Sequence, residues 1–111
     1  MKEENINVQM RKGVLEFCIL SIVNENDAYT SDLIERLKSA HLIVVEGTLY
    51  PLLTRLKNQG YLTYYWEESK SGPPRKYFKI TESGILFLQE LRENWLDFVS
   101  SVNTIIQANN K

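Results

Sequence analysis

The sequence has little of the chemistry from which disulfides, metal sites and membrane spans are built. Its 111 residues include one cysteine, Cys18, and one histidine, His41, so no disulfide can form within the chain and metal-ligand spacing is lacking. No stretch approaches the roughly 18 consecutive apolar residues of a membrane-spanning helix. Residues 1–5 carry mixed charge and lead into no apolar core of a signal peptide. These absences predict a cytoplasmic protein without disulfides, metal ions, cofactors or membrane contact.

Catalytic patterns are also missing. The sequence has no glycine-rich phosphate loop and no Ser/His/Asp set. Acidic residues such as Glu90, Glu93 and Asp97 are not accompanied by a sequence pattern typical of a catalytic pocket. Cys18 falls on an apolar helical face, as a small core residue does, whereas a reactive thiol needs exposure and a lowered pKa. We therefore expect neither an enzyme nor a redox sensor.

What the chain does have is the composition of one small globular domain, with an uneven distribution of charge. Hydrophobic residues make up 43% and charged residues 24% of the sequence, which is ordinary for such a domain. The net charge is -1, but residues 46–80 hold six Lys and Arg against three Asp and Glu. Residues 1–45 hold five basic and seven acidic residues, and residues 81–111 hold two basic and four acidic residues. The middle third therefore concentrates positive charge and is expected to face an anion.

The first half of the chain predicts two amphipathic helices. Between Val8 and Asn24 the apolar spacing of one helical face is widened by Phe17 and Leu20, so we expect this helix to be buried on two sides, one of them against another chain. The oxygens of Thr30, Ser31 and Asp32 then predict the start of a second, shorter helix that ends near residue 40. Residues 41–45 form a link.

A third helix is predicted from Glu46 or Gly47 to Gly60, a plausible C-terminal glycine. Its inner face carries leucines and its outer face carries polar and basic residues, with Pro51 either close to the helix start or at a kink. A hairpin follows, because 61–67 and 75–80 alternate in polarity around a turn-rich stretch, 69–74, that predicts a six-residue tip. The tip region carries Lys70, Arg75 and Lys76 beside Tyr77.

The last segment predicts one long helix that opens at residues 81–84 and runs to about residue 108. Its apolar residues are spaced 3, 4, 3, 4 and 3 apart, the a/d seam of a coiled coil, at Leu88, Leu91, Trp95, Phe98, Val102 and Ile105. Val99 and Ile106 widen the seam. A seam this long outgrows the small domain before it, which favours packing against a second subunit.

The order of these elements predicts a mainly α fold with a small β-hairpin, a winged helix-turn-helix followed by a dimerisation helix. Residues 1–80 would form the DNA-binding domain and residues 81–111 the C-terminal helix, as one compact unit. In this arrangement the third helix enters the major groove of DNA, and the hairpin is the wing that lies on a minor groove or phosphate track.

Two segments, residues 46–62 and 72–84, closely resemble the PadR family of bacterial transcriptional regulators. Residues 10–16 also look like the start of the family's first helix, so the resemblance covers about residues 8–106. It implies a homodimeric repressor that binds a palindromic operator through the third helix and the wing. Most members of the family repress, so the expectation of repression rests on this resemblance.

The resemblance assigns roles to particular residues. The resemblance assigns DNA contacts to Thr48, Tyr50, Arg55, Lys57, Arg75, Lys76 and Tyr77. Helical geometry alone adds Thr54 to this set. The expected dimer interface consists of Phe17, Leu88, Leu91, Trp95, Phe98, Val99, Val102, Ile105 and Ile106. The partners implied are a double-stranded DNA operator and a second copy of the chain.

The single short C-terminal helix is similar to the compact subgroup of the family, which includes multidrug-sensing members. In those members a Trp on the last helix and its symmetry mate stack on flat aromatic drugs, and Trp95 holds the matching position. The resemblance thus implies a pocket for a planar aromatic or phenolic effector, lined by Val14, Leu15, Cys18, Leu91, Trp95 and Val99. One departure is that the drug-binding members have a carboxylate where this chain has Val99.

Two other interpretations stay open. A winged-helix dimer can use the same basic surface to bind a protein partner, since the fold alone does not decide the function. A regulator that binds DNA without any ligand would keep the interface and lack the pocket.

Overall fold

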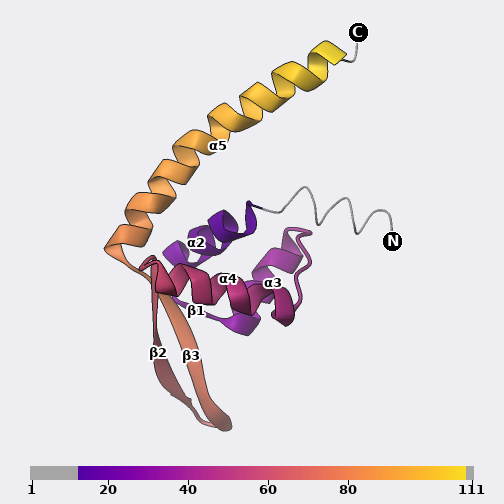
Figure 1. Cartoon of the computed structure of the whole chain (residues 1–111). Coiled ribbons are helices and arrows are strands. Elements are labelled where there is room, and N and C mark those ends of the chain that lie inside the picture. The colour runs from indigo at the N-terminus through magenta and orange to yellow at the C-terminus, as the bar shows by residue number, and fades with distance from the viewer. Residues whose placement is uncertain (1–12, 110–111) are drawn as a thin grey trace.

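The computed structural model describes residues 13–109 and has the mainly helical fold with a small sheet that the sequence predicts. Three helices form the body: α2 (Leu15–Glu25), α3 (Thr30–Ser39) and α4 (Glu46–Asn58). The sheet consists of β1 (Ala28–Tyr29), β2 (Leu62–Ser69) and β3 (Gly72–Ile80), and the chain continues into the long helix α5 (Glu82–Asn109). Figure 1 shows the β2–β3 hairpin and α5 extending away from the body in different directions.

The core is made by the apolar stripes of the helices and one face of the sheet. Leucines on α3 and α4 meet α2 and the first turns of α5, because the 3.6-residue period puts them all on the inner faces. The largest fully buried side chains are Ile19, Leu20, Val23, Leu33, Leu37, Leu49, Leu53, Leu56, Leu62 and Leu88. This core holds α4 with its opposite face toward solvent.

The end of α4 is a glycine cap, as predicted. Gly60 has φ 85°, a left-handed conformation that glycine adopts without steric cost. The Tyr61 N–H donates to the Leu56 carbonyl at 2.9 Å, which closes the six-residue turn of a Schellman motif. Pro51 lies inside α4 rather than at its start. The cap turns the chain directly from α4 into the wing.

The first helix differs from its prediction at the N-terminal side. Gly13 has φ 106° and Val14 precedes the first residue of α2, so α2 begins at Leu15. Residues 8–12 of the predicted helix lie outside the described residues. The apolar spacing cannot locate this boundary, because it carries no information on the left-handed backbone that Gly13 adopts just before the helix.

The hairpin also differs from its prediction, because its tip has two residues rather than six. Ser69 pairs with Gly72, which leaves Lys70 and Ser71 at the tip and places the two prolines inside β3. A register irregularity between Glu67 and Ser69 accommodates them, as bulges accommodate residues that cannot donate to a ladder. Strand β1 was not predicted at all; it pairs with β3 and gives the strand order β1-β3-β2.

A close contact joins the base of the wing to α5. The Thr81 hydroxyl donates to the Gly60 carbonyl at 2.6 Å and accepts from the Gly84 N–H at 3.0 Å, which caps the start of α5. A Cβ on Gly84 would lie 2.2 Å from the Tyr61 carbonyl oxygen. Tyr61 and Phe87 stack with ring centroids 4.3 Å apart. This junction sets the direction in which α5 leaves the body.

Candidate nucleic-acid interface

The outward face of α4 carries most of the predicted DNA contacts. Buried Leu49, Leu53 and Leu56 anchor the helix on its inner side, so the residues between them turn outward. Thr48, Tyr50, Thr54, Arg55 and Lys57 are all exposed. An open hollow of about 590 Å³ on this face is lined by Tyr50, Pro51, Thr54, Arg55, Asn58 and Gln59. The structure therefore leaves all the α4 members of the predicted set accessible, and Tyr50, Thr54 and Arg55 among them line one hollow.

One of these residues, Arg55, is already engaged within the chain. Its Nη2 atom donates to Oε1 of Glu16 on α2 at 2.7 Å. The Arg55 side chain remains 63% exposed, whereas that of Glu16 is 19% exposed. Sequence reasoning did not find Glu16, since nothing in the local pattern connects two residues 39 positions apart.

The wing residues of the predicted set lie on two faces of the sheet, because side chains alternate along a strand. On the face toward α4, the Lys76 ammonium lies 4.0 Å from the centroid of the Tyr64 ring, and the Lys57 ammonium lies 5.8 Å from the same centroid. Trp66 on this face is 62% exposed. Cation–π contacts thus bring a lysine of α4 and a lysine of the wing to a shared tyrosine.

Arg75 and Tyr77 lie on the opposite face of the sheet. Tyr77 packs between Tyr29 and Tyr65, with ring centroids 5.3 Å and 5.8 Å away. The Arg75 guanidinium lies 4.8 Å from the Tyr29 ring centroid and donates to the Tyr29 hydroxyl at 3.3 Å. The Tyr65 hydroxyl donates to the Asp27 carboxylate at 2.7 Å, and this hydrogen bond raises the pKa of Tyr65 to about 12. The three basic and aromatic residues near the predicted tip therefore do not form one surface.

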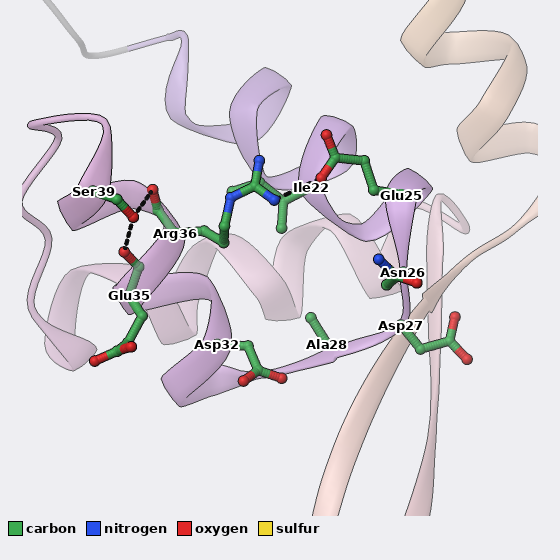
Figure 2. Close-up of a pocket in the computed structure, with 9 residues that line it drawn as sticks. All are labelled: Ile22, Glu25, Asn26, Asp27, Ala28, Asp32, Glu35, Arg36 and Ser39. Carbon is green, nitrogen blue, oxygen red and sulfur yellow. Dashed lines mark hydrogen bonds and ion pairs between the residues drawn. The ribbon is translucent and has the colours of Figure 1, made fainter.

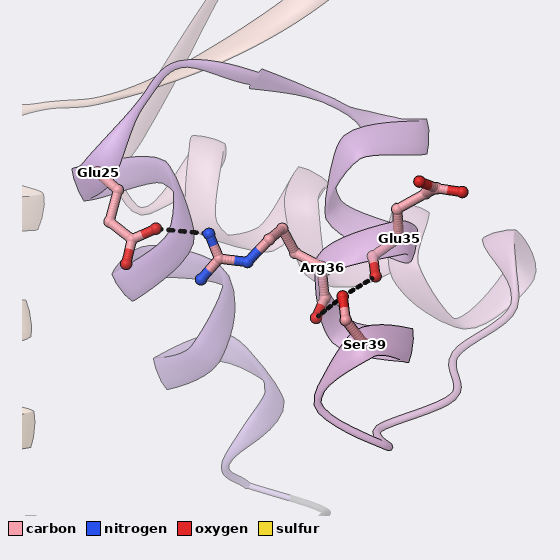
Figure 3. Close-up of polar contacts among 4 residues, drawn as sticks. All are labelled: Glu25, Glu35, Arg36 and Ser39. Carbon is pink, nitrogen blue, oxygen red and sulfur yellow. Dashed lines mark hydrogen bonds and ion pairs between the residues drawn. The ribbon is translucent and has the colours of Figure 1, made fainter.

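Acidic side chains gather elsewhere on the molecule, around a hollow of about 330 Å³ between α2 and α3. Figure 2 shows that α2, the link after it and α3 contribute Glu25, Asp27, Asp32 and Glu35. The Arg36 guanidinium donates to Glu25 at 2.6 Å, both side chains being 54% exposed (Figure 3). This contact lowers the pKa of Glu25. Negative charge thus lies on α2 and α3, and the excess of positive charge lies on α4 and the wing.

Trp95 lies beside a hollow, but only part of the predicted pocket lines it. The hollow has a volume of about 370 Å³ and is lined by Gly13, Val14, Phe17, Leu91, Asn94, Trp95 and Phe98. Phe17 and Trp95 meet edge to face with ring centroids 6.0 Å apart. Leu15 is buried in the core, Cys18 packs against the core, and Val99 is not among the lining residues. Helical phase accounts for Leu15, which points from α2 into the core, whereas Val14, the residue before α2, and Phe17 line the hollow.

The predicted dimer residues divide along α5. Leu88 is 1% exposed because it completes the core of its own chain, so its side chain does not reach the surface of α5. Leu91 also packs partly against this core. Beyond them, apolar side chains on α5 are exposed, with Phe98 61%, Ile105 65% and Ile106 50% accessible. Burial raises the pKa of the Cys18 thiol.

The three-helix body, the wing and the exposed basic face of α4 define a winged-helix DNA-binding protein. Residues 19–90 match the transcriptional regulator PadR-like family, and the chain belongs to this family. Regulators of this family bind DNA, typically dimerise and are not enzymes. Within residues 13–109 no helix is long and apolar enough to cross a membrane.

Solved structures of other family members have the same fold. A PadR-like transcription factor from Bacteroides fragilis is 56% identical, with a TM-score of 0.77 over 91% of this chain and 98% of that one. A PadR family transcriptional regulator from Eggerthella lenta is 31% identical, with a TM-score of 0.84 over 93% and 90% of the two chains. A PadR-like transcriptional regulator from Bacillus cereus is 37% identical, with a TM-score of 0.78 over 89% and 97%.

Proposed function

We propose that this chain is a homodimeric transcriptional repressor that binds a palindromic operator with α4 in the major groove. The exposed face of α4, with Thr48, Tyr50, Thr54, Arg55 and Lys57 outward, is the observation that carries this proposal. Arg and Lys reach guanine edges or phosphates from such a face, and Thr and Tyr bond to bases or backbone. The site of action is then the compartment that holds the chromosome, the cytoplasm of a bacterium.

The wing supports the same interface from beside α4. Lys57 and Lys76 converge on Tyr64, so positive charge continues from the helix onto the inner face of the wing. This arrangement suits a phosphate track next to the groove that α4 enters. Arg75 and Tyr77 face the other side of the sheet and make a second, weaker group of candidate contacts.

Dimerisation through α5 would give the protein the two-fold symmetry that a palindromic operator requires. The apolar residues exposed beyond Leu91 extend along one seam of the helix, and a second copy of α5 would cover them. Two copies of α4 related by a dyad would enter major grooves about one helical turn, ~34 Å, apart.

A mobility-shift experiment with DNA from upstream of the protein's own gene tests the function. We expect one specific complex that weakens steeply with added salt, because binding to phosphates releases counterions. Arg55→Ala is expected to lose specific affinity by roughly 1–3 kcal/mol. Sedimentation of the same sample should give the mass of two chains. No complex on this fragment, followed by no site in a genome-wide selection, would favour the protein-partner interpretation.

A planar aromatic effector at Trp95 is the second part of the proposal. The hollow beside Trp95 is mainly apolar and aromatic, as ligand sites commonly are. Helix α2 connects it to the DNA-binding face, since Phe17 contacts Trp95 while its neighbour Glu16 binds Arg55. A ligand that displaces Phe17 would thereby shift α4 and release DNA, which makes the effector an inducer.

A further inference from the structure

The contact between Glu16 and Arg55 joins two helices at the proposed DNA-binding face. Glu16 lies in the first turn of α2, where the positive end of the helix dipole stabilises a carboxylate. Its side chain is 19% exposed and its Oε1 atom lies 2.7 Å from Nη2 of Arg55. The carboxylate is therefore largely covered, and its position is set by α2 rather than by solvent.

Only one edge of the Arg55 guanidinium is used by this contact. An arginine has five N–H donors, and the Arg55 side chain stays 63% exposed beside the α4 hollow that Tyr50 and Thr54 also line. A side chain that is held at one edge has fewer conformations to lose when its other edge binds a ligand. Most of the conformational entropy of Arg55 is therefore already lost in the free protein, before DNA binds.

From this geometry we infer that Glu16 is a positioning residue of the DNA interface, which orients Arg55 toward the operator without touching DNA itself. The inference rests on the proposed function. A carboxylate so close to the interface also repels phosphates, and this repulsion acts on every DNA sequence. An oriented Arg55 favours only a site that places a guanine or a phosphate at its free edge. Glu16 therefore increases the difference in affinity between operator and unrelated DNA.

The chain contains a matched control for this contact. Glu25, also on α2, binds Arg36 at 2.6 Å, with both side chains 54% exposed. Figure 3 shows this pair bridging α2 and α3. Loss of either carboxylate removes one ion pair of α2, but only the loss of Glu16 frees an arginine on α4.

The test measures dissociation constants for operator and for unrelated DNA with full-length Glu16→Ala, Glu16→Gln, Glu25→Ala and Arg55→Ala variants. Glu16→Ala should weaken operator binding roughly tenfold, because the freed Arg55 side chain must then be ordered when DNA binds, and should leave binding to unrelated DNA equal or tighter. Glu16→Gln keeps an acceptor and should fall between wild type and Glu16→Ala. Glu25→Ala should change neither constant. In an Arg55→Ala background, Glu16→Ala should have no further effect on operator binding.

Four results would overturn the inference: unchanged operator binding by Glu16→Ala, tighter operator binding by this variant, an equal loss on both DNAs, or the same loss in the Arg55→Ala background. Thermal unfolding of each variant checks the fold, and Glu16→Gln provides the measurement if Glu16→Ala unfolds. Wild-type protein that fails to bind any operator would overturn the proposed function itself. Normal wild-type binding with an unchanged Glu16→Ala variant would overturn only the role of Glu16.

Discussion

Replacement of Gly84 by alanine tests the packing of α5 on the base of the wing. The added Cβ would lie 2.2 Å from the Tyr61 carbonyl oxygen and 2.7 Å from Cγ1 of Ile80. The nearer neighbour is backbone and cannot rotate away, so the first turn of α5 must move by on the order of 1 Å to reach ordinary contact distances. That movement strains the two hydrogen bonds that Thr81 makes to residues 60 and 61, at 2.6 Å and 3.1 Å.

The expected loss of stability follows from these contacts. Overpacking costs about 1–3 kcal/mol, and two weakened hydrogen bonds cost about 1 kcal/mol each. Alanine returns about 1 kcal/mol through its higher helix propensity. The net destabilisation is about 2–4 kcal/mol, which lowers Tm by roughly 10–30 °C in a domain of this size.

Thermal unfolding at one fixed protein concentration measures this effect, because the Tm of a dimer depends on concentration. Gly47→Ala is the matched control. Gly47 lies in the first turn of α4, and a Cβ there meets nothing within 4 Å, so its Tm should stay equal or rise. A Gly84→Ala protein with the Tm of wild type would refute the steric reasoning.

Two further variants test contacts on the sheet and at α5. The hydrogen bond to Asp27 raises the pKa of Tyr65 to about 12, so it stabilises the fold below the ordinary pKa near 10 and is lost as pH rises from about 10 to 12. Chemical unfolding across this range should therefore show a smaller decrease in stability for Tyr65→Phe than for wild type, and equal decreases would contradict the assignment. In a mobility shift at protein concentrations where sedimentation gives the mass of two chains, operator complexes of Trp95→Ala should no longer be released by planar aromatic compounds. Release at wild-type compound concentrations would count against the pocket.

Much of the fold follows from local patterns in the sequence. The leucine spacing of α3 and α4 sets their buried faces because neighbours three and four residues apart share one side of a helix. Gly60 ends α4 because that position requires a left-handed backbone. The seam along 91–106 predicts the exposed apolar face of α5 for the same reason, and the outward position of Arg55 and Lys57 on α4 is a consequence of helical phase alone.

Other features depend on residues that are distant in the sequence. β1 has two residues and forms because they pair with the edge of β3. A segment of two residues is too short to show the alternation of polarity that predicts a strand. Leu88 fits the heptad seam equally well whether a partner or its own domain buries it, and only the docking of α5 on α2 decides between the two.

The same limit applies to the candidate site. Side-chain alternation places Arg75 and Lys76 on opposite faces of the wing, but the register that opposes Lys76 to Trp66 depends on a two-residue tip, which the run of turn residues at 69–74 does not locate. Glu16 meets Arg55 across 39 residues, and Gly84 approaches Tyr61 across the whole hairpin. By itself the sequence therefore determined the helices, their faces and the family, since these depend on spacings of a few residues. The tertiary structure alone decided which charges and backbones meet, because those contacts exist only after the helices and the sheet have packed together.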